Sequence, residues 1–148
     1  MKMVITAEEF NARGRGHLPG HLGLHITLAS PGEVRATMAV CQHHMAPNGY
    51  LHAGAVVTMA DTCCGYGCLL NLPENASGFT TVELKSNHVG TALSGSVECI
   101  ATPLHIGRTT QVWDATVRHL ESGKTIAIFR CTEMVLYPSS KATKAPQS

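Results

Sequence analysis

The chain has 148 residues, which is enough for a single domain with its own hydrophobic core. Hydrophobic residues make up 44% of it but aromatic residues only 5%, so small and aliphatic side chains must fill that core. The 11 basic and 10 acidic residues leave a net charge of +1, too little to hold nucleic acid or an anionic membrane by charge. We therefore expect neither nucleic acid nor a membrane as a partner.

Six cysteines lie in apolar stretches of a domain large enough to fold without disulfides, and we expect no secretory leader before them. These features predict reduced thiols and a cytoplasmic protein. The most apolar stretch, Ala53 to Leu72, approaches the length of a membrane span. Asp61 lies near its middle, where a carboxylate costs about 2.5–3.5 kcal/mol in a bilayer. The stretch is therefore predicted to be a buried helix.

The first predicted element is a short helix over Thr6 to Arg13, with Thr6 as its N-cap and Glu9 completing a capping box. Glycines and a proline follow, and residues 13–16 are expected to form a flexible linker. From residue 22 the pattern has a period of two, so Leu24, Ile26 and Leu28 should share one face of a strand. After a Ser-Pro-Gly turn the alternation resumes and completes a hairpin.

Residues 42–51 have no periodicity and are predicted to form a loop that leads into the apolar helix. Beyond the helix the period-two pattern returns in four strands, Phe79–Val89, Gly95–Thr102, Thr109–Leu120 and Thr125–Leu136. The order β-β-α-β-β-β-β predicts an α+β fold, in which the helix covers one face of an antiparallel sheet. One domain is expected over residues 1–137, with a disordered polar tail at 138–148.

The central helix has an unusually thin body, because alanine, glycine and cysteine occupy many of its positions. A thin helix allows a sheet to wrap closely around it. Asp61 interrupts its apolar pattern. A carboxylate in such surroundings must be paired, neutralised or placed beside a ligand, so Asp61 is the leading candidate for a functional group.

Three segments together resemble the hotdog-fold thioesterases, most closely the group that includes the phenylacetate-pathway acyl-CoA thioesterase. The most specific segment runs from Asn48 to Gly54 and continues into Ala60-Asp61-Thr62; the others are residues 105–108 and 131–134. The resemblance covers residues 15–137 and implies a hotdog fold, with the antiparallel sheet wrapped around one long central helix. It also implies hydrolysis of an acyl-CoA thioester.

The resemblance assigns roles to several residues. Asp61 would be the nucleophile or the base that activates water, and the backbone N–H of residue 53 would bind the thioester carbonyl. The sequence has Ala53 where the family usually has glycine, and Ala46 where relatives often carry Asn or Gln. Asn48 is a candidate to replace that side chain, and Thr81 is a candidate helper near the attacking water.

The residues supply the groups that the chemistry implied by the resemblance needs. Thioester hydrolysis needs a group that delivers or activates oxygen and a donor for the developing oxyanion, and the start of a helix presents free N–H groups. Asp61 lies about 12 Å along the helix from Ala53, so one helix cannot serve one carbonyl with both groups. Two antiparallel copies can, which predicts a homodimer or a dimer of dimers with the sites at the dimer interface. His52 either contacts the substrate or caps the helix.

Gly107 and Arg108 are candidates to bind a CoA phosphate, and a solvated hairpin arginine is the competing interpretation. The histidines and cysteines show no zinc-type ligand spacing, so no metal is expected, and no cofactor beyond the coenzyme A of the substrate. The predicted function is hydrolysis of a small aromatic or medium-chain acyl-CoA. The alternatives are an acyl-thioester hydratase or dehydratase and a non-catalytic acyl-CoA-binding protein.

Overall fold

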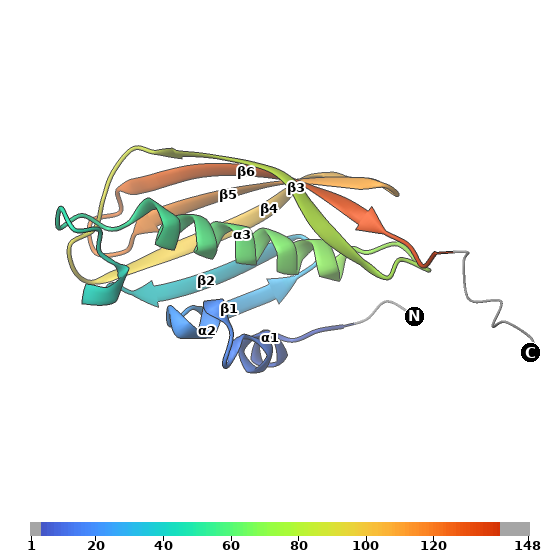
Figure 1. The fold of residues 1–148 in the computed structure, drawn as a ribbon, viewed down its shortest axis with the longest axis horizontal. Helices are drawn as coiled ribbons and strands as arrows, with labels where there is room; N and C mark the ends of the chain where they lie inside the picture. The colour runs from blue at the N-terminus through green and yellow to red at the C-terminus, as the bar shows by residue number, and fades with distance from the viewer. Residues whose placement is uncertain (1–3, 140–148) are drawn as a thin grey trace, which may run out of the picture.

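The computed structural model describes residues 4–139, and its strands form one antiparallel sheet in the order β1-β2-β4-β5-β6-β3. The strands are β1 (His25–Ser30), β2 (Glu33–Ala39), β3 (Gly78–His88), β4 (Ser96–Ile106), β5 (Thr110–His119) and β6 (Thr125–Leu136). One long helix, α3 (Ala53–Leu70), lies along the sheet (Figure 1). The predicted element order and the α+β hotdog architecture are confirmed. Most of the tail predicted at 138–148 lies outside the described residues.

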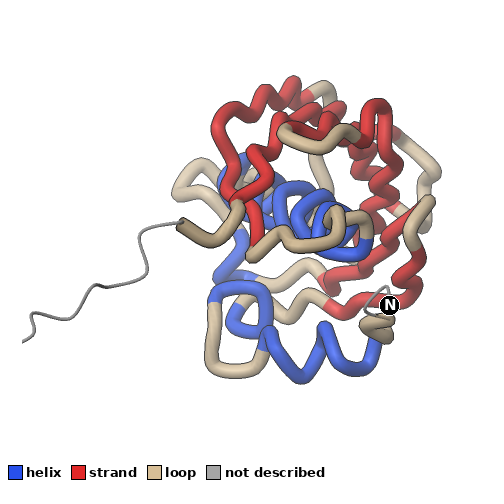
Figure 2. Tube along the Cα trace, turned by 90° about the vertical axis from the view of Figure 1, so that its right-hand side faces the viewer, coloured by secondary structure: helices blue, strands red, loops and turns tan. Residues whose placement is uncertain are grey.

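The sheet curves around α3, as the view along the helix in Figure 2 shows. Glycines on the helix allow this close approach. A Cβ atom at Gly67 would lie 2.5 Å from the ring of Trp113, and one at Gly65 would lie 2.9 Å from the ring of Phe79. Trp113 is fully buried. The thin helix predicted from the composition is therefore the feature that lets large rings of the sheet pack directly on its backbone.

By length and composition alone, α3 could cross a membrane. More than half of it is buried inside the protein, however, against the inner face of the sheet. The prediction of a buried core helix is therefore confirmed.

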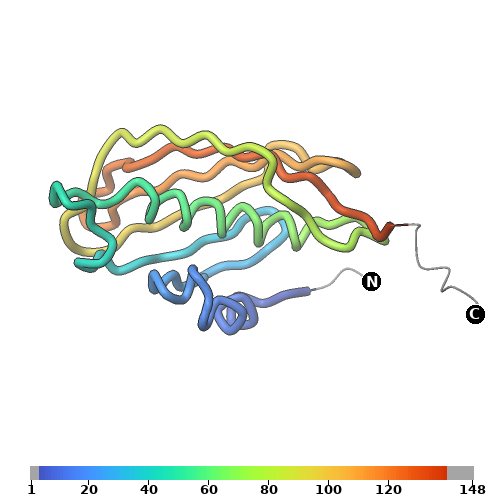
Figure 3. Tube along the Cα trace, in the orientation of Figure 1, coloured from blue at the N-terminus to red at the C-terminus, as the bar shows by residue number. Residues whose placement is uncertain are grey.

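The N-terminal segment packs beside the β1 edge of the sheet (Figure 3). Helix α1 (Ala7–Gly14) begins with the predicted capping box of Thr6 and Glu9. The side chain of Asn11 accepts from the N–H of Ile26 at 2.7 Å and donates to its carbonyl at 3.0 Å, so α1 binds polar groups of an edge strand that would otherwise be free. The linker expected at 13–16 is wrong in part, because α1 extends to residue 14 and a second short helix, α2 (Leu18–His21), follows.

Two predictions about the strands are wrong, both because of β-bulges. The pairing of β1 with β2 shifts between Ile26 and Leu28, so Leu28 leaves the buried face and is 40% exposed. Strand β4 does not end at residue 102 but continues through Pro103, next to a register shift between Pro103 and His105. Its pairing with β2 ends at Ala101. Pro103 therefore occupies an edge position at a bulge, where proline is tolerated.

Candidate active site

The N-terminus of α3 is capped by a histidine. His52 is the N-cap, and its Nδ1 accepts the N–H of Gly54 at 2.8 Å. A Cβ at Gly54 would lie 2.9 Å from that Nδ1, so glycine is needed for the close cap. The capping role expected as one of two alternatives for His52 is thus present. Because Nδ1 accepts a hydrogen bond, the neutral ring carries its proton on Nε2, which remains available to a ligand.

Ala53 follows the cap and is exposed to solvent. The N–H groups of Ala55 and Val56 bind the carbonyl of His52, and Gly54 binds the His52 ring. Within residues 4–139 the N–H of Ala53 donates to nothing, which leaves it as the free donor of the first turn. A free N–H at the positive end of a helix dipole is suited to a carbonyl oxygen that becomes negative.

The loop before α3 is built on a buried histidine. His44 lies in η1 (Gln42–His44), accepts the N–H of Cys41 at Nδ1, and binds the carbonyl of Leu22 through Nε2 at 2.7 Å. Its own carbonyl accepts the N–H of His52. Both ring nitrogens of His44 are used structurally. No cluster of three metal-binding side chains occurs among residues 4–139.

Asn48 lies at the tip of the turn that precedes the helix. The N–H of Gly49 donates to the carbonyl of Ala46, Gly49 has a φ of 87°, and Asn48 Oδ1 accepts the N–H of Tyr50 at 3.2 Å. The side-chain oxygen of Asn48 therefore already stabilises its own turn. Asn48 is exposed and lies at the N-terminal end of α3, separate from Asp61.

Asp61 and Thr81 are brought together by the packing of α3 on β3. Thr81 Oγ1 donates to Asp61 Oδ1 at 3.5 Å, near the upper limit for a hydrogen bond. Burial raises the pKa of the Asp61 carboxyl, and the Thr81 hydroxyl lowers it. A half-buried carboxylate with a raised pKa is a stronger base than an exposed one, and it can accept a proton from water or attack a carbonyl directly.

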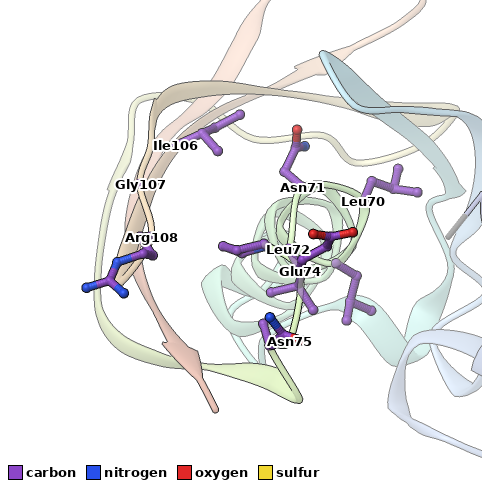
Figure 4. A pocket seen from close by; sticks show the side chains of 11 residues that line it. Leu70, Asn71, Leu72, Glu74, Asn75, Ile106, Gly107 and Arg108 are labelled. Carbon is purple, nitrogen blue, oxygen red and sulfur yellow. The ribbon is translucent and has the colours of Figure 1, made fainter. Parts of the chain in front are cut away.

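Gly107 and Arg108 lie in the β4–β5 turn, at the opposite end of α3 from Ala53. They line a cavity of about 670 Å³ together with the last residues of α3 and the segment that follows it. The guanidinium of Arg108 is directed away from Leu72 (Figure 4) and makes no ion pair with a residue of the described chain. The structure thus joins Asp61 with Thr81, and Ala53 with His52, but it separates these two pairs from each other and from Arg108.

Two buried polar residues near the site escaped the sequence analysis. Glu133 on β6 and Gln111 on β5 are both fully buried, and they pair with each other across the two strands. Thr81 on β3 pairs with Glu133 from the other side. A carboxylate at an inward position of a strand, between Cys131 and Val135, was the signal that could have identified Glu133.

Comparison with known proteins identifies the family. Residues 48–126 match the model of the thioesterase superfamily. A 1,4-dihydroxy-2-naphthoyl-CoA hydrolase of Escherichia coli is 33% identical over 91% of this chain and 98% of its own length. A thioesterase of Haemophilus influenzae has a solved structure that superposes with a TM-score of 0.85 at 32% identity, covering 92% of this chain and 94% of that one.

The chain belongs to the thioesterase superfamily, and it is a thioester hydrolase. Structures of two variants of a Staphylococcus aureus thioesterase, with TM-scores of 0.76 at 28% and 27% identity, cover 80% of this chain and 97–98% of that one. One variant replaces a glutamate and the other a glutamine. These two positions are separated by as many residues as Asp61 and Ala46.

Proposed function

We propose that the protein hydrolyses the thioester of a small aromatic or medium-chain acyl-CoA. Asp61 acts as nucleophile or general base, and the N–H of Ala53 polarises the carbonyl. The observation that carries this proposal is the free N–H of Ala53 at the start of a helix that also holds a half-buried carboxylate. Water is the co-substrate, and the reaction uses no cofactor beyond the coenzyme A of the substrate.

The N–H of Ala53 and the carboxylate of Asp61 cannot act on one carbonyl within a chain, because about 12 Å of helix separates the two residues. A second copy with its α3 antiparallel brings Ala53 of one subunit to Asp61 of the other, in an isologous dimer. A difference between the two edges of the sheet supports this arrangement. Asn11 of α1 binds the β1 edge, whereas β3 is an edge strand that exposes Val82 and Leu84. Within residues 4–139 no strand pairs with the outer side of β3, and this edge, beside Asp61, is the surface we assign to the dimer.

Arg108 would bind a phosphate of coenzyme A. Its support is an exposed guanidinium without an ion pair in the described chain, on a residue that lines a cavity large enough for part of a substrate. The aromatic acyl group named for the E. coli relative supports an aromatic substrate. The six free thiols support a cytoplasmic location.

A thiol-release assay with a panel of acyl-CoA thioesters tests the proposal. The panel includes benzoyl-, phenylacetyl-, medium-chain and long-chain acyl-CoA, and the proteins are the wild type and Asp61→Asn. We expect release from aromatic or medium-chain members, and a loss of at least about 100-fold in kcat for Asp61→Asn. Asp114→Asn, at a carboxylate paired with Arg130 on the sheet, is the matched control and should keep its activity.

Two results would contradict the proposal. Release only from long-chain substrates would refute the acyl preference, and full activity of Asp61→Asn would refute the role of Asp61. Each of the two alternative functions predicts a different assay result. A hydratase would change the absorbance of an enoyl-CoA without releasing thiol, and an acyl-CoA-binding protein would bind the thioester and leave it intact.

A further inference from the structure

Glu133 is a buried carboxyl group to which the proposed mechanism gives no role. Its side chain is fully buried on the face of β6 that packs against α3. Oε1 accepts from the thiol of Cys131 at 3.4 Å, and Oε2 has no hydrogen-bond partner among the described residues. An unsatisfied buried carboxyl oxygen is unfavourable, because it has lost its hydration and gained no hydrogen bond in return, so its retention calls for a physical reason.

The position of Glu133 in the sheet places it next to the candidate catalytic pair. Thr81, Glu133 and Gln111 form one cross-strand row on β3, β6 and β5. One end of the row is hydrogen-bonded to α3, and the other end to Asn71, the residue that follows α3. Thr81 donates to Asp61, and Gln111 donates to the carbonyl of Asn71 at 3.1 Å. Gln111 also accepts from Trp113. Within this row of described residues, Oε2 of Glu133, in the middle, is therefore the one buried side-chain polar atom without a partner.

The groups that face Glu133 favour its neutral form. They are Asp61 and Cys68 from α3, Cys131 from its own strand and Thr81 from β3, and none of them is a cation. Burial and the charge of Asp61 raise the pKa of the Glu133 carboxyl, while the Thr81 hydroxyl and the Cys131 thiol lower it. Burial raises the pKa of the Cys68 thiol to about 12, so that thiol is neutral as well. Glu133 is fully buried and Asp61 only partly, so ionisation costs Glu133 more hydration than it costs Asp61.

The Thr81 hydroxyl lies between two carboxyl groups and has one proton to give. Were both carboxyls ionised, they would compete for that proton and repel each other. A protonated Glu133 removes the competition, because its O–H can donate to the oxygen of Thr81 and leave the Thr81 proton for Asp61. The result is a directed chain of donors from Glu133 through Thr81 to the carboxylate of Asp61.

We propose that Glu133 is a positioning residue, which as a neutral acid fixes the Thr81 hydroxyl as a donor to the Asp61 carboxylate. The proposal rests on the role assigned to Asp61 above. Glu133 itself does not reach the substrate. It acts only through Thr81, and its effect is to orient Asp61 and to keep it ionised.

The pH dependence of kcat/KM distinguishes a neutral Glu133 from an ionised one. Because the Thr81 hydroxyl lowers the pKa of Asp61, loss of its orientation moves the acid limb of the profile to higher pH. In Glu133→Met we therefore expect a shift to higher pH and a fall of about tenfold in kcat at unchanged KM. Glu133→Gln keeps a neutral donor, so its acid limb should stay in place and its kcat within about twofold of the wild type.

Removing an ionised Glu133 would instead relieve repulsion and move the acid limb of both variants to lower pH, which would overturn the proposal. An unchanged kcat in Glu133→Met would also overturn it. Glu98→Gln, at a carboxylate paired with Arg118 on another part of the sheet, is the matched control. It should leave the profile unchanged.

A double-mutant cycle with Thr81→Val keeps the test decisive even if Glu133→Met is too unstable to assay. Glu133→Gln still reports the direction of the pH shift, and Glu133→Leu supplies a second apolar replacement for the cycle. If Glu133 acts through Thr81, the double variant is no slower than Thr81→Val alone, whereas multiplicative losses would contradict this proposal.

Asp61→Asn in the same assay separates the two proposals. Its full activity refutes the proposed function, whereas its inactivity beside an unaffected Glu133 series refutes only this inference.

Discussion

At the scale of single residues, the first turn of α3 combines satisfied and free donors. The N–H groups of Gly54, Ala55 and Val56 all bind His52, through its ring or its carbonyl. Ala53 lies between the cap and these residues; it is exposed, and its N–H has no acceptor within residues 4–139. The histidine therefore does more than begin the helix. It satisfies the neighbouring donors and leaves one N–H for an oxyanion.

Ala53→Pro removes this N–H and little else. Ala53 is the first residue of the helix, where proline is tolerated, and His52 has a ψ of 131°, which suits a residue before proline. We expect a loss of about 100- to 1,000-fold in kcat, as is typical when an oxyanion-hole donor is removed. Steady-state kinetics and circular dichroism on the same preparation provide the measurement.

Ala53→Val is the control for the added bulk, because valine keeps the N–H. Its kcat should stay well above that of the proline variant even if KM rises. Equal losses in the two variants would show that space, and not the N–H, matters at this position.

Asp61 should carry a stability penalty that depends on pH. Burial raises its pKa in the folded state, so its ionised form is less favourable when folded than when unfolded. The penalty is complete above the folded pKa and disappears below the unfolded value of about 3.9. Asp61→Asn should therefore melt at a higher temperature than the wild type at pH 8, by about 2–4 °C for each kcal/mol relieved. The gain should vanish as the pH falls below about 4. A constant difference across this range would contradict the penalty.

At the scale of elements, the slender α3 explains how a chain with a single tryptophan builds its core. Trp113 is fully buried, and its ring lies directly over the backbone of Gly67. Its Nε1–H is bonded to Gln111 at 2.9 Å, so the ring is also held by a hydrogen bond and cannot shift freely. One large ring, packed on a glycine, fills space that several aromatic residues would otherwise occupy.

Gly67→Ala should therefore be destabilising, although alanine is the better helix former. The new Cβ would lie 2.5 Å from the Trp113 ring, and such overpacking costs about 1–3 kcal/mol. Denaturant unfolding gives the free energy. Gly32→Ala is the control, because a Cβ at Gly32 would have no atom within 4 Å apart from those of its own residue and its two chain neighbours. An unchanged midpoint for Gly67→Ala would show that the ring can move aside.

Periodicity predicted α3 and all the strands, because the spacing of apolar residues that marks a buried face is a property of each segment's own sequence. It placed Leu28 on the wrong face and ended β4 too early, since a β-bulge arises from the partner strand and not from the strand itself. Asp61 was found because it interrupts an apolar helix. The strand pattern of β6 contains the inward carboxylate of Glu133, but its neighbour Thr81 lies in a strand about 50 residues away, a pairing that local patterns do not reveal.

At the scale of the whole molecule, the sheet has two unequal edges. Helix α1 binds the β1 edge through Asn11, while β3 exposes apolar side chains beside the helix that carries Asp61. Long apolar edges are normally covered in a stable protein. Pairing two copies along this edge would protect it and would also bring the two separated halves of the site together.

Mixing two inactive variants tests this arrangement directly. Asp61→Asn subunits keep the N–H of Ala53, and Ala53→Pro subunits keep the carboxylate of Asp61. A mixed dimer therefore has one intact site and one site that lacks both groups. Random reassortment of equal amounts should restore about a quarter of the wild-type activity, since half of the dimers are mixed and each has one working site. The variants are unfolded and refolded together, and the control is the same pair refolded separately and then combined. If the co-refolded sample contains mixed dimers by native mass spectrometry and yet stays inactive, each site is built within one chain.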